Sequence, residues 1–218
     1  MTCLGQYNAA THTQMHFQNQ PRGFLTTLPP APPGLEGNSY IHEEWNSAVI
    51  YLTDSTKLSD INVRIDVIEG LVEIEYDKEI KVLPVSRILA ISLKRNNGTE
   101  EYVNGSTLGI GNFYNYLLQV VHGDTVMLLS RIHGEIVHAN NNPHPMLDTG
   151  EKNDKIILKK SYIIVKGKEF VNVAGKGKFK DDMERVFGTE VDSLIDKINT
   201  KKENDLVLLV KKLNGLKS

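Results

Sequence analysis

Five residues near the first strand pattern carry the side chains best suited to chemistry. Tyr40, His42, Glu43, Glu44 and Trp45 place aromatic, imidazole and carboxyl groups within one short segment. Such a set can transfer protons or stack on a sugar ring. The one Trp of the chain beside a first strand is more typical of a buried plug with the acids facing solvent, because an indole buries a large area. We favour the plug and keep the five residues as a candidate ligand or partner site.

The other candidate catalytic groups lack a complete pattern. Glu73 and Glu75 point to the same side of one predicted strand, which could raise the pKa of one of them if the pair were enclosed. A glycosidase needs carboxylates that flank a bond in a cleft, and the wet face of a sheet explains this pair adequately. The sequence contains no G-x-S-x-G elbow, and Cys3 is its only cysteine. The sequence therefore predicts no catalytic residue.

Metal and phosphate sites are equally incomplete. His133, His138 and His144 fall around an Asn-rich segment, but their spacing matches no compact ligand motif. The run Gly175–Lys178 precedes a predicted helix, where free backbone N–H groups attract anions, yet it lacks the spacing of a P-loop. We therefore predict no metal, no cofactor, and a flexible connection at residues 175–178.

Composition and charge limit the partners. The chain has 218 residues, 40% of them hydrophobic and 24% charged, which suits a globular domain with its own core. The formal net charge of -2 argues against a nucleic-acid partner. The net charge is negative over residues 1–150 and positive over 151–218. The positive part could meet an anionic partner, but its mixed signs favour a solvated Lys-rich face.

Alternating apolar and polar residues predict an antiparallel β-meander. Ile61, Val63, Ile65 and Val67 alternate with polar residues, as a strand with one wet face requires. Short turns separate the segments, and no helical period lies between them, so antiparallel pairing is favoured. The predicted strands cover residues 48–52, 61–67, 72–76, 80–82, 87–94, 101–103, 114–121, 125–132, 155–158, 162–166 and 169–173.

The period becomes helical at Lys176. One helix runs to a stop at Gly188, a second starts at Thr189 with Asp192 completing a weak capping box, and a third contains Leu206 and ends near Gly215. Such short helices must pack on each other or on the sheet to bury their apolar stripes. The predicted class is α+β: an antiparallel meander or partial barrel with a C-terminal cap of about three helices.

Three segments follow from these patterns. Residues 1–38 form an extended Pro/Asn/Gln-rich lead-in, residues 39–173 the β domain, and residues 174–218 the helical cap. The prolines of the lead-in favour a stiff spacer over a docking motif. Residues 1–10 read like the end of a signal peptide, although the basic and apolar parts of one are not present. No apolar run is long enough for a transmembrane segment, and peripheral membrane contact stays open.

Two blocks of the sequence resemble a family of exported proteins of Bacteroidota. The first block comprises residues 37–45, followed by 48–52 and 62–66, and is similar to the family's opening of tyrosine, acid and tryptophan before a β-meander. The second block is residues 176–215, similar to the family's Lys-rich C-terminal helices. The resemblance implies a periplasmic or otherwise exported protein and brings no activity.

The function predicted first is a non-enzymatic envelope protein that acts by contact with a protein partner, in an oligomeric state that the sequence leaves open. The second hypothesis is a module that binds a small hydrophobic ligand within a curved meander. Polar residues at alternate positions, such as Asn62 and Arg64, speak against a large lumen. The third is a hydrolase with its site near residues 42–45, which we rank last.

Overall fold

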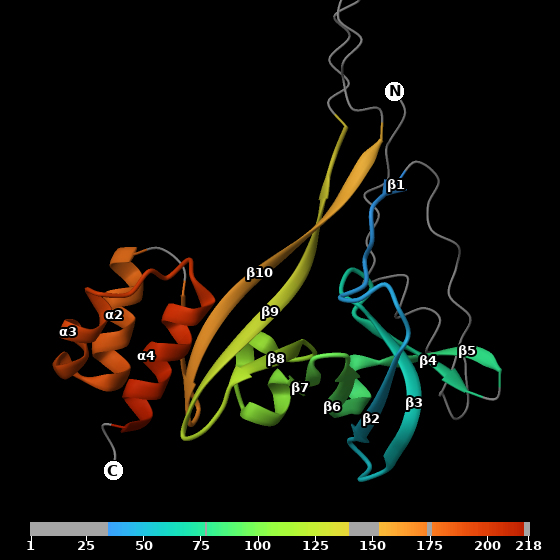
Figure 1. Ribbon diagram of the computed structural model, residues 1–218, viewed down its shortest axis with the longest axis horizontal. Coiled ribbons are helices and arrows are strands. Elements are labelled where there is room, and N and C mark those ends of the chain that lie inside the picture. The colour runs from blue at the N-terminus through green and yellow to red at the C-terminus, as the bar shows by residue number, and fades with distance from the viewer. Residues whose placement is uncertain (1–34, 77, 140–152, 174–175, 216–218) are drawn as a thin grey trace, which may run out of the picture. The chain divides into compact units, whose positions relative to one another are not determined.

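The computed structural model describes residues 35–76, 78–139, 153–173 and 176–215 (Figure 1). Most of the predicted lead-in, with Cys3 and the signal-peptide remnant, lies outside these residues, as do His144 and Gly175. The described chain forms two compact units. The first unit contains residues 35–47, 61–84 and 133–159, and the second contains 48–60, 85–132 and 160–215. Each unit is therefore built from segments that are distant in the sequence.

The sheet is open and almost wholly antiparallel. Its hydrogen-bonding order is β1-β10-β9-β8-β7-β6-β2-β3-β4-β5, with β11 beside β10, so the order does not return to its first strand. The strands are β1 (Leu35–Glu36), β2 (Asn46–Leu52), β3 (Lys57–Asp66), β4 (Leu71–Tyr76), β5 (Glu79–Pro84), β6 (Ile88–Arg95), β7 (Gly98–Asn104), β8 (Leu117–His122), β9 (Val126–Val137), β10 (Asp154–Lys166) and β11 (Glu169–Asn172). The predicted antiparallel α+β meander is confirmed.

In the first unit, β3, β4 and β5 form the predicted meander. Val63 pairs with Ile74 and Ile65 pairs with Val72 across β3 and β4, and all four side chains are buried. This apolar face follows directly from the period-two alternation of the sequence. The sequence did not predict β1, which takes Leu35 from the lead-in and pairs in parallel with β10.

Several strand boundaries differ from the predicted ones. β8 begins at Leu117 and not at residue 114, because the chain first makes a 3-10 turn at Gly111–Phe113 and a left-handed residue at Asn115, with φ of 61°. β10 is one continuous strand where two were predicted. The apolar pattern marks where strands are buried and does not mark where hydrogen bonding stops.

In the second unit, β9 and β10 are covered on both faces. Leu128 and Ile164 belong to a cluster with the apolar side chains of the C-terminal helices. Leu129 and Ile163 belong to another cluster with the 3-10 turns around Phe113. Adjacent residues of a strand point to opposite faces, so these two strands separate two apolar layers.

Within the described residues, three α-helices follow the last strand: α2 (Lys176–Phe187), α3 (Asp192–Ile195) and α4 (Glu203–Gly215). Gly188 ends the first helical segment with φ of 87°, as its position predicted. The predicted capping box at Thr189 is wrong. Thr189 begins a 3-10 turn that Gly188 precedes, and α3 has Val191 as its N-cap without a side-chain hydrogen bond.

One side chain attaches α4 to the sheet. The Nδ2 of Asn214 donates to the backbone oxygen of Val126 at 2.9 Å, and its Oδ1 accepts from the Val126 N–H at 2.7 Å. A primary amide can bond both the N–H and the C=O of one residue, whereas an apolar side chain would leave both backbone groups unsatisfied. Asn214 therefore fixes the end of α4 against the first residue of β9.

We expect Asn214→Ala to lower the free energy of unfolding by about 2 kcal/mol, because two hydrogen bonds are lost at a partly buried backbone. Asn172→Ala, at an exposed residue of β11, should change it by less than about 0.5 kcal/mol. Urea denaturation of both variants measures the difference. Equal stability of the two variants would contradict a docking role for Asn214.

Candidate functional site

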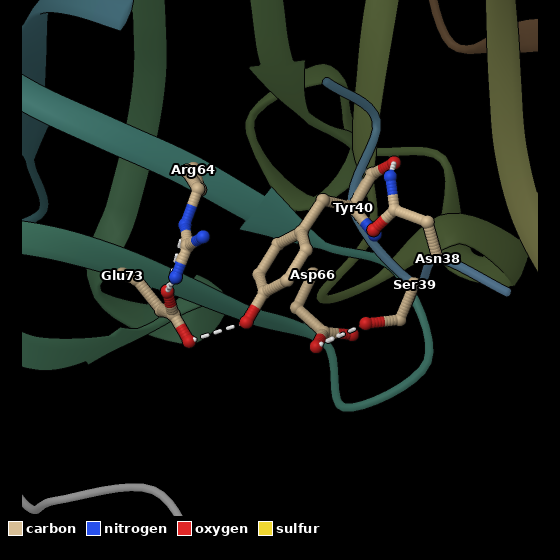
Figure 2. A network of polar contacts seen from close by, with 6 residues as sticks. All are labelled: Asn38, Ser39, Tyr40, Arg64, Asp66 and Glu73. Atoms are coloured by element: carbon tan, nitrogen blue, oxygen red, sulfur yellow. Dashed lines mark hydrogen bonds and ion pairs between the residues drawn. The ribbon is translucent and has the colours of Figure 1, made fainter. Parts of the chain in front are cut away.

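A buried ion pair lies at the centre of the first unit's polar network (Figure 2). Arg64 of β3 stands directly opposite Glu73 of β4 in the ladder. The Nε and Nη2 of Arg64 donate to Oε2 of Glu73 at 3.1 and 2.6 Å. The Glu73 side chain is only 2% exposed, so the prediction that it lies on the wet face is wrong. A carboxylate buried this deeply requires a partner such as this guanidinium.

Two aromatic rings lie against the same guanidinium. The central carbon of the Arg64 guanidinium is 4.3 Å from the ring centroid of Tyr40 and also 4.3 Å from that of Trp45. The Tyr40 hydroxyl donates to Oε1 of Glu73 at 2.7 Å. Burial, followed by the hydrogen bond to Glu73, raises the pKa of Tyr40. The phenol therefore stays protonated and serves as a donor.

Asp66 connects this network to the chain that leads into β2. Its Oδ2 accepts from the Ser39 hydroxyl at 2.7 Å, and its Oδ1 accepts from the backbone N–H groups of Ile68 and Glu69, both at 2.9 Å. Burial raises the pKa of Asp66, although the hydrogen bonds act in the opposite direction. The carboxylate therefore closes the turn after β3 and holds Ser39 beside it.

Backbone contacts place Tyr40 over the sheet. The N–H of Val67 donates to the Ser39 oxygen and the N–H of Ile41 to the Ile65 oxygen, both at 2.9 Å. Tyr40 and Asp66 thus form an isolated antiparallel bridge. Asn38 adds a local turn, since its Oδ1 accepts from the Tyr40 N–H at 2.9 Å (Figure 2). The segment is fixed by β-type pairing as well as by its side chains.

The structure separates the five candidate site residues into two groups. Tyr40 and Trp45 come together on Arg64, and Trp45 is half-buried. His42 is half-buried, while Glu43 and Glu44 are exposed. The sequence analysis missed Arg64 as the residue that joins the two rings. No spacing in the sequence identified the pair, because Arg64 meets Glu73 only through the register in which β3 and β4 pair.

The Glu73 carboxylate has its hydrogen-bond partners within the chain. Both Glu73 oxygens accept hydrogen bonds, and its Arg64 partner is covered by two rings. Among the described residues, the buried side-chain polar atoms without a hydrogen bond are Arg131 Nε, His133 Nδ1 and Asp192 Oδ1, and none of these belongs to the network. Its groups are therefore committed to one another, and the arrangement is suited to holding the fold.

The histidines of the metal hypothesis do not assemble in the described part of the chain. His138 Nδ1 lies 2.9 Å from Asp154, and His133 Nε2 lies 3.8 Å from Glu135. No group of three or more His, Cys, Asp or Glu side chains that could hold a metal occurs among the described residues. His144 lies outside them.

In the second unit, Arg131 has a donor without a hydrogen-bond partner. The guanidinium carbon of Arg131, on β9, lies 3.9 Å from the ring centroid of Tyr116. Its Nε is buried without a hydrogen-bond partner, and no described carboxylate forms an ion pair with it. Tyr116 is 42% exposed and the nearby Tyr114 is 55% exposed. We call Tyr114, Tyr116 and Arg131 the Tyr–Arg surface.

The loop that carries the two tyrosines rests on a buried support. Asn104 is fully buried, and its Nδ2 donates to the backbone oxygens of Val85 and Ile88 at 2.9 and 3.0 Å. Gly105 packs so closely on Phe113 that an added Cβ would lie 2.2 Å from the Phe113 oxygen. The Gly105 N–H donates to the Tyr116 oxygen at 3.0 Å. These contacts hold the Tyr–Arg surface in place.

Comparisons of the chain with protein-family models, with curated proteins and with solved structures found no match. Among the described residues, no helix has the length and apolar character needed to cross a membrane. The resemblance to exported proteins of Bacteroidota stays a prediction.

We expect Glu73→Gln to lower the free energy of unfolding by about 2–3 kcal/mol, because it leaves the Arg64 charge without its anion. The effect should fall below that of a fully buried pair, since Arg64 is 22% exposed. Glu75→Gln, two residues along β4 and exposed, should change it by less than about 0.5 kcal/mol. Thermal and chemical unfolding measure both, and equal effects would contradict the role given to the ion pair.

The raised pKa of Asp66 has a predictable effect on stability. The pKa of Asp66 is higher in the folded protein than in the unfolded chain, where it is near 3.8. Between these two pKa values the unfolded chain loses the proton before the folded protein does. The free energy of unfolding therefore falls as the pH rises through this window. We expect the stability of Asp66→Asn relative to wild type to rise with pH over that window. Asp60→Asn should show the opposite slope at lower pH, between the folded-state pKa of Asp60 and about 3.8, because Lys94 lowers the pKa of Asp60. Urea unfolding at a series of pH values measures both, and parallel slopes would contradict the assignment.

Proposed function

We propose that this protein is a non-enzymatic component of the cell envelope that binds another protein through the Tyr–Arg surface. The observation that carries this proposal is the state of Arg131, which is stacked on an exposed tyrosine and has no carboxylate partner among the described residues. A second exposed tyrosine, Tyr114, lies next to the stack in the sequence. The partner would supply a carboxylate for the remaining donors of the half-buried Arg131 guanidinium.

The chemistry of the surface matches known preferences of protein interfaces. Tyrosine and arginine are enriched among the residues that dominate binding energy, because each joins a large contact area to a hydrogen-bonding group. A guanidinium presents a planar fork of donors that fits a carboxylate with two bonds. The stack on Tyr116 already restricts Arg131, so less side-chain entropy is lost on binding. The partner's group is accordingly an Asp, Glu or C-terminal carboxylate.

The other charged regions support this choice of surface. In the C-terminal helices, Lys180 lies 3.9 Å from Glu184 and 3.5 Å from Asp192, and Arg185 lies near Asp182 and Glu169. These basic groups already have acidic neighbours, which favours a solvated face of mixed charge over a docking site for a polyanion. The Arg64 network is likewise occupied, which supports a role without catalysis.

The placement in the envelope rests on the resemblance to exported proteins of Bacteroidota. It is tested by separating cytoplasmic, periplasmic and membrane fractions of cells that produce the protein from its own gene. We expect the protein in an envelope fraction. Recovery in the cytoplasm alone would contradict the placement and would leave the binding surface to be tested separately.

The binding surface is tested by a photocrosslinking amino acid placed at Tyr114 in living cells. We expect one discrete crosslinked product, reduced about tenfold in an Arg131→Gln background, because the charge-assisted hydrogen bonds to the partner are lost. Mass spectrometry of the product should place the crosslink beside a partner carboxylate.

Tyr51 provides a matched control, since it is a 41% exposed tyrosine of the same unit with the Lys57 ammonium 5.6 Å from its ring centroid. The crosslinker at Tyr51 should give no discrete product, and Lys57→Gln should leave the product from Tyr114 unchanged. Circular dichroism checks that Arg131→Gln keeps the fold. Equal crosslinking from both tyrosines, or a product that does not respond to Arg131→Gln, would overturn the proposal.

A further inference from the structure

The strand β5 ends the hydrogen-bonding order of the sheet. Among the described residues it pairs with β4 only, and β4 and β5 form a hairpin in the first unit (Figure 1). Near the tip of this hairpin two apolar side chains are exposed, Tyr76 at 47% and Ile80 at 48%. An edge strand offers a row of backbone donors and acceptors to any strand that can lie beside it.

The register of the hairpin identifies the outward-facing backbone groups. Tyr76 pairs with Glu79, so two residues connect β4 to β5, and the closing pair of such a hairpin is hydrogen-bonded. Hydrogen-bonded and non-bonded pairs alternate along an antiparallel ladder. Glu79 and Lys81 therefore direct their backbone groups toward β4, whereas Ile80 and Val82 direct theirs outward. Pro84 also falls at an outward position, which is where a sheet tolerates a residue without an N–H.

The charges on β5 are self-complementary. Glu79 and Lys81 flank Ile80, and the Glu79 side chain is 75% exposed. Within one copy the Lys81 Nζ lies 3.9 Å from Glu79 and 4.9 Å from the Tyr76 ring centroid. If two copies of β5 pair antiparallel about Ile80, each Glu79 stands opposite the Lys81 of the other copy, and Ile80 stands opposite Ile80. A shift that centres the pairing on Lys81 would instead oppose two like charges, which is destabilising. The charge pattern thus selects one register.

We infer that β5 is an interface between two copies of this chain, paired antiparallel about Ile80. The pairing joins the outward backbone groups of Ile80, buries two exposed isoleucines, and sets each Glu79 opposite the Lys81 of the other copy in addition to its 3.9 Å contact within one copy. A second copy is favoured over an unrelated strand because the edge itself carries both complementary charges. This inference concerns a different surface from the Tyr–Arg surface and does not depend on it.

Charge exchange tests the pairing. Sedimentation equilibrium of the full chain over a range of concentrations should show a monomer–dimer equilibrium. Glu79→Lys and Lys81→Glu should each raise the dimer dissociation constant about tenfold or more, because each places like charges opposite each other twice. The double variant, Glu79→Lys with Lys81→Glu, should restore dimerisation. Circular dichroism of each variant reports whether the monomer keeps its fold.

An ion pair elsewhere serves as the control for charge changes. Lys94 and Asp60 lie 2.9 Å apart and are exposed. Exchanging these two residues should leave the dimer dissociation constant within about twofold of wild type, since β5 is unchanged. A wild-type chain that stays monomeric at every concentration would overturn the inference. A dimer that ignores the single exchanges, or a double variant that stays dissociated, would overturn it as well.

A disulfide tests the register. The Cα atoms of a hydrogen-bonded antiparallel pair are about 5.5 Å apart, within the range that a disulfide spans. In a Cys3→Ser background, Ile80→Cys should give a crosslinked dimer on mild oxidation. Leu89→Cys, at another exposed apolar residue, should not. Equal crosslinking at the two positions would overturn the pairing of two copies. Hydrogen exchange gives a second check, because protection of the β5 amides that appears only when another protein is added would overturn it as well.

Discussion

The cost of burying a charge organises the first unit of this protein. Glu73 lies between the buried Val72 and Ile74 on β4, and removal of a carboxylate from water is unfavourable unless a partner compensates it. Arg64, directly opposite on β3, supplies that partner, and the rings of Tyr40 and Trp45 cover the guanidinium. The aromatic segment that precedes β2 is therefore attached to β3 and β4 through one ion pair. The bridge between Tyr40 and Asp66 adds backbone support to the same attachment.

The second unit depends on apolar burial on two sides of the same strands. β9 and β10 contribute Leu128 and Ile164 to the layer under the helices, and Leu129 and Ile163 to the layer under the 3-10 turns. Neither layer could be left uncovered without exposing a continuous apolar surface. The helices are too short to be stable in isolation, so their packing on the sheet is what stabilises them.

The two arginines that stack on tyrosine differ in their other contacts. Arg64 has a buried carboxylate and two rings, and its Nε and Nη2 donate to that carboxylate. Arg131 has the ring of Tyr116, and no described carboxylate pairs with it. The same side-chain chemistry therefore stabilises the fold in one place, and in the other it is the contact that we propose for a partner. The difference lies in what faces the guanidinium, and not in the residue types.

The sequence by itself determined the class of the fold, because alternation of apolar and polar residues and the change to a helical period at Lys176 are local properties that require burial on one face. It also marked Tyr40 and Trp45 as unusual. It could not reveal that Arg64 joins them, that Glu73 is buried, or that Arg131 lacks an acidic partner. These features depend on strand register, on the contacts of the segment before β2, and on which side chains meet across long stretches of chain. Register and long-range contact are decided by tertiary packing, since the same alternation permits many pairings and only the assembled structure shows which charges meet.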